Sequence, residues 1–103
     1  ITLHIGEALD VRPALPAPWD MAFIDANKRN YTDYYDLLVP RMRSGGLILA
    51  DNTLWSGKIL QPRDKADAQT RALLDFNDHV AADSRVERVI LPLRDGLTIV
   101  RVL

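Results

Sequence analysis

Two short apolar runs of the sequence end in acidic residues. "MAFID" (21–25) closes with Asp25, and "LILAD" (47–51) closes with Asp51, which Asn52 follows directly. Ligands bind beyond the carboxyl ends of strands in open parallel sheets, so these side chains would converge if the two runs are neighbouring strands. Two carboxylates and an amide oxygen are hard ligands that Mg²⁺ accepts, and neither His nor Cys stands beside them. The set predicts a divalent-cation site and argues against zinc.

The same residues also have an ordinary structural interpretation. Asp and Asn favour turns because their side chains bond nearby backbone groups, so either acid alone could be only the cap of a turn. Lys28, three positions after Asp25, could be a solvated surface lysine, or it could lie over the metal as a general base. Trp55, in "TLWSG", could belong to the core or form the wall of a pocket for a flat substrate. Their occurrence together favours a site.

The elements that must position these residues are strands and helices in alternation. Short apolar runs bounded by turn residues predict strands at 1–5, 21–25, 47–51, 86–91 and 97–103. Continuous apolar runs such as 47–50 predict strands that are covered on both faces, as in parallel sheets. The alternation predicts an α/β fold with right-handed crossovers.

Two helical patterns separate the strands. The first covers about 32–42, with Thr32 as its N-cap and the turn at 44–46 as its stop, and Pro40 should kink or shorten it. The second covers about 64–82. Its apolar face consists of Ala66, Leu73, Phe76 and Val80. Both helices are expected to pack on the sheet.

The last two strands are predicted to differ from the others. Asp95-Gly96 separates 86–91 from 97–102, which predicts an antiparallel hairpin. A mostly parallel sheet with one antiparallel C-terminal strand is therefore the expected architecture. The segment 11–20, with three prolines, is expected to be a surface connection after a short helical turn at 7–11.

The composition limits the function classes. The chain has 103 residues, a net charge of −1 and no cysteine. One core is expected at this length, and no basic face is available to bind nucleic acid. The lack of cysteine excludes disulfides, thiolate metal sites and a cysteine nucleophile. No apolar run reaches the roughly 18 residues of a membrane span, so we expect a soluble, cytoplasmic protein that binds neither nucleic acid nor membrane.

Three longer segments resemble the cation-dependent O-methyltransferases that use S-adenosylmethionine, the family of caffeoyl-CoA and catechol O-methyltransferases. They are "FIDANKRNYTDYY" (23–35), "SGGLILADNTLWSGKI" (44–59) and "LPLRDGLTIV" (91–100). In the caffeoyl-CoA type a Lys follows the first metal Asp by three positions and an Asp-Asn pair follows it by 26, and this chain keeps both spacings. The resemblance implies the C-terminal portion of a Rossmann-like class I methyltransferase fold.

The resemblance also implies roles for the residues at the strand ends. Asp25, Asp51 and Asn52 would hold Mg²⁺ or another divalent cation such as Mn²⁺ or Ca²⁺. Lys28 would assist deprotonation of the methyl acceptor, and Trp55 would line the acceptor pocket. The reaction would transfer a methyl group from S-adenosylmethionine to a hydroxyl of a catechol-like or other small phenolic acceptor.

Other residues would contact the donor or the acceptor. Glu7 and Ala8 would lie beside the adenine of the methyl donor, and Asp25 would also approach the donor. Asp95 matches a position that contacts substrate in caffeoyl-CoA enzymes, and a turn-forming Asp before Gly explains it equally well. Asn27 stands where the family commonly has a second Asp, which would alter the polarity of the pocket.

The resemblance places much of the donor site outside the 103 residues. The glycine-rich turn and the acid that binds the ribose hydroxyls belong to strands that would precede Ile1. Residues 1–103 are therefore expected to be the C-terminal part of a single methyltransferase domain, completed by an N-terminal half or a second polypeptide. In that sheet 1–5 would be an edge strand separated from 21–25. The segment 67–76 lacks the tyrosines that clamp a CoA ester, so the acceptor stays open.

Two other classes of function also stay open. A Mg²⁺-dependent hydrolase would use carboxylates at strand ends, but the tryptophan loop would have no role in it. A non-catalytic α/β module would use 86–102 as a pairing surface for a homo-oligomer, with the acids as caps. The enzyme itself is expected to be a homo-oligomer, a dimer by preference. Titration with a divalent metal discriminates between a site and a module.

Overall fold

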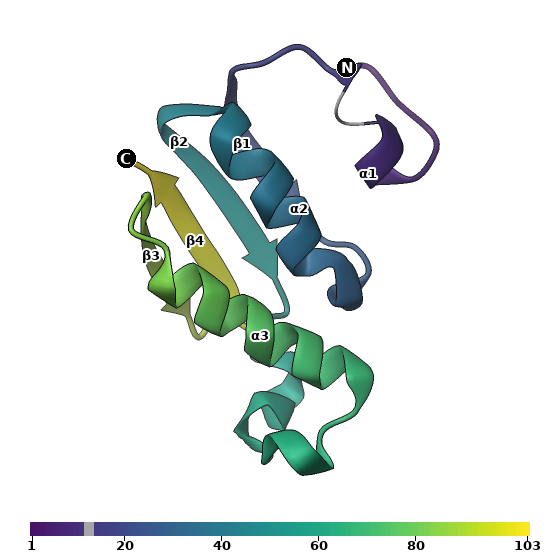
Figure 1. Cartoon of the computed structure of the whole chain (residues 1–103), viewed down its shortest axis with the longest axis vertical. Coiled ribbons are helices and arrows are strands. Elements are labelled where there is room, and N and C mark those ends of the chain that lie inside the picture. The colour runs from purple at the N-terminus through teal and green to yellow at the C-terminus, as the bar shows by residue number, and fades with distance from the viewer. Residues whose placement is uncertain (12–13) are drawn as a thin grey trace.

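A four-stranded mixed sheet lies at the centre of the molecule (Figure 1), for which a computed structural model describes residues 1–11 and 14–103. The strands are β1 (Trp19–Ile24), β2 (Met42–Asp51), β3 (Val86–Leu91) and β4 (Leu97–Val102), in the order β1-β2-β4-β3. β1 and β2 are parallel, and β4 is antiparallel to both β2 and β3. Only β4 therefore runs against the others among the described strands, which confirms the predicted sheet and hairpin.

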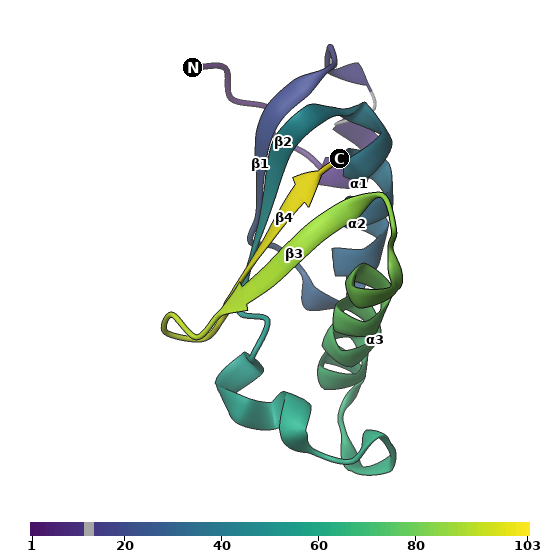
Figure 2. The same cartoon turned by 90° about the vertical axis from the view of Figure 1, so that its left-hand side faces the viewer.

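The helices lie together on one side of this sheet, as the view in Figure 2 shows. The helical elements are α1 (Ala8–Val11), η2 (Lys28–Asn30), α2 (Tyr31–Leu38), η3 (Val39–Arg41), η4 (Trp55–Leu60), η5 (Arg63–Lys65) and α3 (Ala68–Ala82). The short α1 confirms the predicted helical turn near 7–11. Residues 12–13 of the predicted proline-rich connection lie outside the described residues. None of the described helices is long and apolar enough to cross a membrane.

The hydrophobic core lies between the two longer helices and the sheet. Tyr31 and Tyr35 of α2 pack edge-to-face on Phe76 of α3, with ring centroids 5.4 and 6.0 Å apart. Burial of each such ring contributes about 1.5–3 kcal/mol to stability. The predicted apolar face of the second helical pattern is confirmed for three residues that are buried on α3: Leu73, Phe76 and Val80. Ala66 is also buried, but it precedes the helix, which begins at Ala68 and not near 64.

The opposite face of the sheet has no covering layer among the described elements. The register puts Met21 and Phe23 of β1 beside Leu47 and Leu49 of β2 on this face, and the β1 pair is 62% and 57% exposed. The prediction of helices on both faces is therefore wrong for the described chain. A continuous apolar run needs two covering layers, and α2 and α3 both lie on the same side (Figure 2).

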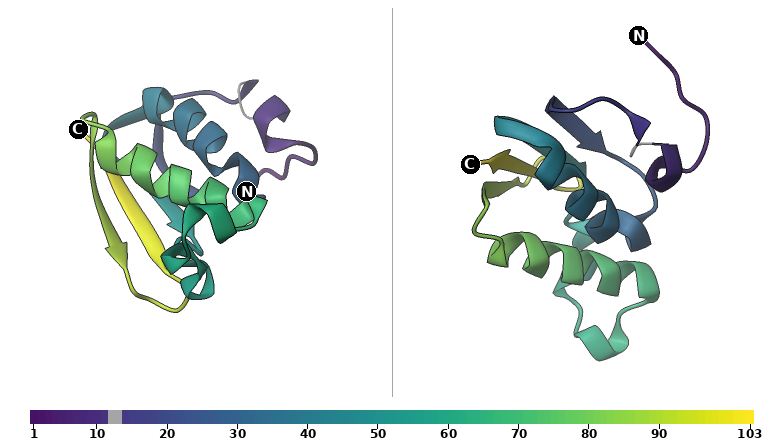
Figure 3. Two further views of the ribbon diagram at one scale, coloured as in Figure 1. Left: turned by 60° about the horizontal axis from the view of Figure 1, so that its bottom comes forward. Right: turned by 45° about the horizontal axis from the view of Figure 1, so that its top comes forward.

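Residues 1–5 form no strand, contrary to the prediction. Ile1, Leu3 and Ile5 are exposed, and the segment extends away from the sheet (Figure 3). An apolar alternation becomes a strand only where a neighbour pairs with its N–H and C=O groups. No described strand offers such a neighbour to 1–5.

The boundaries of the first predicted helix also change. α2 begins at Tyr31, so Thr32 lies inside its first turn. Asn30 takes the N-cap position, where its side chain accepts no capping hydrogen bond from the helix backbone. Pro40 shortens the α-helix as predicted, because the chain continues as the 3₁₀ turn 39–41.

The strand β2 begins earlier than the predicted run 47–51, and it includes the expected turn at 44–46. Gly45 has a φ of 79°, which glycine adopts without a steric penalty. The register against β1 shifts between Trp19 and Met21, as in a β-bulge. The glycines therefore accommodate an irregular strand rather than a turn.

Candidate functional site

The carboxyl ends of β1 and β2 bring the predicted metal ligands together. Ile24 of β1 pairs with Ala50 of β2, so Asp25 and Asp51 follow paired residues of parallel neighbours. Asn52 then turns the chain with a φ of 62°, a left-handed conformation that Asn tolerates better than most residues. No group of three His, Cys, Asp or Glu side chains suited to a metal occurs in the described chain, since the third member here is an amide.

Lys28 lies between these side chains and is only 7% exposed. Its Nζ donates hydrogen bonds to Asn52 Oδ1 at 2.8 Å and to the Tyr31 hydroxyl at 2.6 Å, and it lies 3.5 Å from Asp25 Oδ1. An ammonium group has three donors, and these contacts use them all. The interpretation of Lys28 as a solvated surface residue is therefore wrong.

Tyr31 holds the lysine in this position, a role that the sequence did not reveal. Its hydroxyl accepts from Lys28 and donates to the backbone oxygen of Asp51 at 2.9 Å. Burial raises the pKa of Tyr31 well above its usual range, and the carboxylates of Asp25 and Asp51 raise it further. The hydroxyl therefore stays protonated. The spacing of three residues from Asp25 to Lys28 and again from Lys28 to Tyr31 was the sequence signal that could have indicated this role.

Trp55 lies on the loop that follows Asn52 and packs partly against the core. The Nζ atoms of Lys28 and Lys58 lie 5.7 and 5.6 Å from its ring centroid, within the range of cation–π attraction. Its indole Nε1 is buried and has no hydrogen-bond partner among the described residues. The ring therefore stands beside the lysine and the proposed ligands.

Buried polar groups fasten this loop to its neighbours. Thr53 is fully buried, and its hydroxyl accepts a hydrogen bond of 2.9 Å from Thr98 of β4. Its backbone oxygen accepts from Nδ2 of Asn77 on α3 at 3.1 Å. The loop is thereby tied to both the sheet and the helix layer.

Asp95 lies at the tip of the β3–β4 hairpin, against the same loop. Its carboxylate accepts from Asn52 Nδ2 at 3.1 Å and from the backbone N–H of Ser56. A hollow beside it is lined by Asn52, Ser56, Arg94 and Asp95. The structure thus brings Asp95 to the proposed metal ligands through contacts within the chain.

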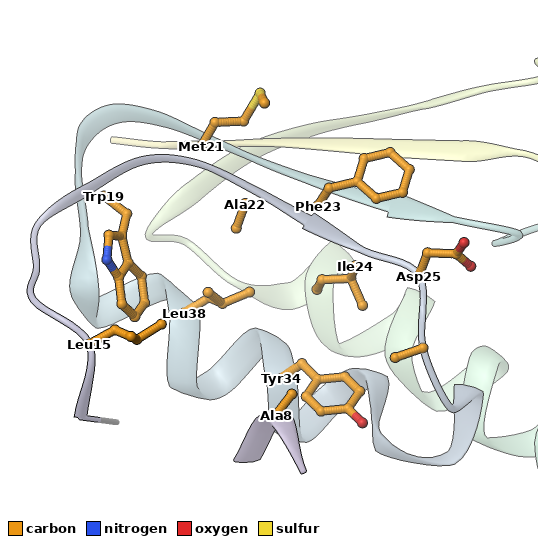
Figure 4. Close-up of a pocket in the computed structure, with 11 residues that line it drawn as sticks. Ala8, Leu15, Trp19, Met21, Ala22, Phe23, Ile24, Asp25, Tyr34 and Leu38 are labelled. Atoms are coloured by element: carbon orange, nitrogen blue, oxygen red, sulfur yellow. The ribbon is translucent and has the colours of Figure 1, made fainter. Parts of the chain in front are cut away.

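A pocket of about 410 Å³ lies between β1, α1 and α2 (Figure 4). Its lining includes Ala8 and Asp25, both predicted to contact the methyl donor. Burial raises the pKa of Tyr34, which lines the pocket, and the charge of Glu7 raises it further. Figure 4 shows that the pocket wraps the free edge of β1: Trp19, Ala22 and Ile24 lie on the α2 side of the strand, and Met21 and Phe23 lie on the other.

Known proteins resemble this chain in sequence. The profile of a family described as O-methyltransferase matches residues 2–103. Caffeoyl-CoA O-methyltransferase of Petroselinum crispum is 37% identical over 119 residues, which cover 94% of this chain and 48% of that protein. Tricin synthase 1 of Oryza sativa is 42% identical over 90 residues, which cover 82% of this chain and 36% of that protein.

Solved structures agree with the sequence comparison. The O-methyltransferase TomG of Streptomyces achromogenes, solved in complex with SAM, has a TM-score of 0.87 and 31% identity, covering 96% of this chain and 48% of its own. The SAH-bound methyltransferase PaMTH1 of Podospora anserina has a TM-score of 0.83 and 27% identity, covering 95% of this chain and 47% of its own. The fold is thus that of the Rossmann-like methyltransferases. The chain spans about half the length of these solved structures.

The family profile extends over nearly the whole sequence, from residue 2 to residue 103. On these grounds the chain belongs to the O-methyltransferase family.

Proposed function

We propose that this chain supplies the metal and acceptor side of an O-methyltransferase that depends on S-adenosylmethionine and a divalent cation. The observation that carries the proposal is the approach of Asp25 and Asn52 to the buried ammonium of Lys28 at the ends of β1 and β2. Family membership favours methyl transfer over a hydrolase or a non-catalytic module.

The oxygen atoms at the strand ends fit a hard cation such as Mg²⁺, Mn²⁺ or Ca²⁺. Asp25 Oδ1 and Asn52 Oδ1 lie within 3.5 Å of one cationic nitrogen, so they approach closely enough to face the same charge. The Tyr31 hydroxyl, which accepts from Lys28, donates to the backbone oxygen of Asp51 at 2.9 Å, so Asp51 follows the same part of the chain into this cluster. Bound there, a divalent cation would orient two adjacent hydroxyls of the acceptor and lower the pKa of one of them.

The residues of this chain would do the remaining work by positioning and proton transfer. A phenolic oxygen forms the new bond to the methyl carbon as the carbon–sulfur bond of the donor breaks. The phenolic proton passes to Lys28, whose ammonium must first give up one proton to solvent to become the amine. Trp55 would flank the acceptor ring. Ala8 and Asp25, which line the same pocket, would contact the donor, and Glu7 would lie beside its adenine.

The proposed acceptor is a catechol-like or other small phenol, because two adjacent hydroxyls match a cation that chelates and orients its substrate. Relatives of this chain carry the names caffeoyl-CoA O-methyltransferase and tricin synthase. We also propose that the enzyme works in the cytoplasm as a homodimer. Further polypeptide would close the donor pocket at the free edge of β1.

Titration with Mn²⁺, followed by electron paramagnetic resonance, tests the cation site. The unmodified chain should bind the ion, and Asp51→Ala should weaken binding by more than about tenfold, because it removes a proposed ligand. Asp64→Ala, a change of an exposed aspartate on η5, is the matched control and should bind as the unmodified chain does. Equal affinities of the unmodified chain and Asp51→Ala would contradict the proposed site.

A further inference from the structure

We infer that Asp95 is a positioning residue, whose carboxylate sets the orientation of the Asn52 amide so that Oδ1 faces Lys28 and the proposed cation. The geometric part rests on contacts within the chain, and the consequence for the cation rests on the proposed function. This role is separate from the acceptor contact that the family resemblance implies, because it rests on the bonds of the Asp95 carboxylate to Asn52 and Ser56 within the chain.

Hydrogen-bond chemistry allows one orientation of the Asn52 amide. Lys28 Nζ carries only donors, so the atom 2.8 Å from it must be the carbonyl oxygen. The Asp95 carboxylate carries only acceptors, so the atom 3.1 Å from its Oδ2 must be the amino nitrogen. If the Asn52 amide were flipped, its amino group would face the donor Lys28 Nζ and its oxygen would face the acceptor Asp95 Oδ2. The two partners therefore fix the amide together.

The hairpin tip holds the backbone of the loop as well as this side chain. The second carboxylate oxygen of Asp95 accepts from the Ser56 N–H. The backbone oxygen of Asp95 accepts from the Leu54 N–H at 2.9 Å, and that of Gly96 accepts from the Thr53 N–H at 3.3 Å. Every loop residue from 52 to 56 except Trp55 thus bonds to the tip.

The loop needs such support because of its backbone conformation. Asn52, Trp55 and Ser56 have φ values of 62°, 50° and 53°. Residues with a Cβ atom keep this left-handed conformation only where the surroundings impose it. The carboxylate of Asp95 bonds to Asn52 and Ser56, the first and last of these residues, and so it spans the strained segment.

Gly96 makes the close approach of the hairpin possible. Its φ is 85°, and a Cβ at this position would lie 2.5 Å from Leu54 Cγ and 2.7 Å from the Leu54 nitrogen. No side chain fits there unless the hairpin moves away from the loop. Gly96→Ala therefore displaces Asp95 while leaving its carboxylate intact, and it is a second, independent variant.

The side-chain amide of Asn52 gives a readout that needs no metal. In the isotope-labelled 103-residue chain, NMR should show its amino protons protected from solvent exchange. Asp95→Ala and Gly96→Ala should each speed that exchange by about tenfold or more, because the acceptor is lost or displaced. Glu87→Ala, which removes a carboxylate of the same hairpin that pairs with Arg101, should leave it unchanged.

The folded state of each variant is checked by the dispersion of its backbone amide signals. Unchanged Asn52 exchange in folded Asp95→Ala overturns the inference. If Asp95→Ala does not fold, Asp95→Asn and Gly96→Ala decide it. Asp95→Asn keeps the size of the side chain but offers one acceptor oxygen to the two donors, Asn52 Nδ2 and the Ser56 N–H. Faster exchange at either donor supports the inference, and unchanged exchange at both overturns it.

Titration with Mn²⁺ connects the orientation to the proposed cation site. Asp95→Ala should weaken Mn²⁺ binding by about 10- to 100-fold, the usual effect of losing a residue that orients a ligand. Unchanged affinity together with faster Asn52 exchange would overturn the consequence for the cation. An unmodified chain that binds no Mn²⁺ would contradict the proposed function, and the amide exchange would then decide the role of Asp95 alone.

Discussion

Tyr31 joins the proposed base to the sheet through a single hydroxyl. Tyr31→Phe keeps the ring that packs on Phe76 but leaves the Lys28 ammonium and the Asp51 carbonyl each without one partner. We expect the free energy of unfolding to fall by about 1–3 kcal/mol, because buried polar groups lose their bonds. Urea denaturation followed by tryptophan fluorescence measures the change.

Tyr34→Phe is the matched control for this prediction. It removes a hydroxyl from the same helix at the wall of the donor pocket, and it should change the free energy of unfolding by less than about 0.5 kcal/mol. An effect of Tyr31→Phe no larger than that of the control would show that the hydroxyl does not hold the lysine.

The sequence was sufficient to predict which residues meet at the strand ends, and it did not reveal what orients them. Asp25, Asp51 and Asn52 could be placed together because parallel neighbours end at the same edge of a sheet. The partner of Asn52 could not be found, because Asp95 lies 43 residues away and meets it only through the packing of a hairpin on a loop. A pattern of neighbouring residues in the sequence cannot predict such a long-range contact.

At the scale of elements, Asp83 connects the end of α3 to α2. Its Oδ2 accepts from the Tyr35 hydroxyl at 2.8 Å and from Arg85 Nη2 at 2.8 Å. The Arg85 side chain holds the pKa of Asp83 well below its usual range, with help from the Arg85 N–H and the Tyr35 hydroxyl. A carboxyl group whose folded-state pKa is depressed stabilises the fold above its unfolded pKa of about 4, and this contribution is lost as the pH falls below that value.

Asp83→Asn should therefore lower the free energy of unfolding at neutral pH by about 1–3 kcal/mol. The difference from the unmodified chain should shrink as the pH falls from about 4 to about 2. Urea denaturation at several pH values across this range measures the difference in the free energy of unfolding. Asp64→Asn, which changes an exposed aspartate, is the control. A difference that stays constant with pH would contradict the assigned role of the charge.

Local patterns predicted elements well where burial comes from a near neighbour. The face of α3 and the β3–β4 hairpin were found because their periodicity and turn residues are local. The prediction of a strand at 1–5 was wrong, because an alternation of apolar residues does not show whether a pairing strand is present. The prediction of a turn at 44–46 was wrong for a related reason. Glycine occurs in a β-bulge inside a strand as readily as in a turn, so its presence does not distinguish the two.

At the scale of the whole molecule, the two edge strands β1 and β3 each lack a further partner among the described strands, and one face of the sheet has no covering layer there. The pocket of Figure 4 lies along the edge strand β1, and its lining includes Ala8 and Asp25. The chain also spans about half the length of its solved relatives. We expect the 103-residue chain to bind S-adenosylmethionine weakly or not at all. Isothermal titration in the presence of Mg²⁺ measures this, and binding in the micromolar range would contradict the prediction.

The place of β4 in the sheet also sets an order of events during protein synthesis. β4 comes after β3 in the chain but lies between β2 and β3, and β3 pairs with no other described strand. The hairpin therefore cannot join the sheet until Leu97–Val102 has left the ribosome. A nascent chain that stops before that point already has Asp25, Asp51 and Asn52, but it has no hairpin tip to hold the loop. The candidate site is consequently among the last parts of this chain to assemble.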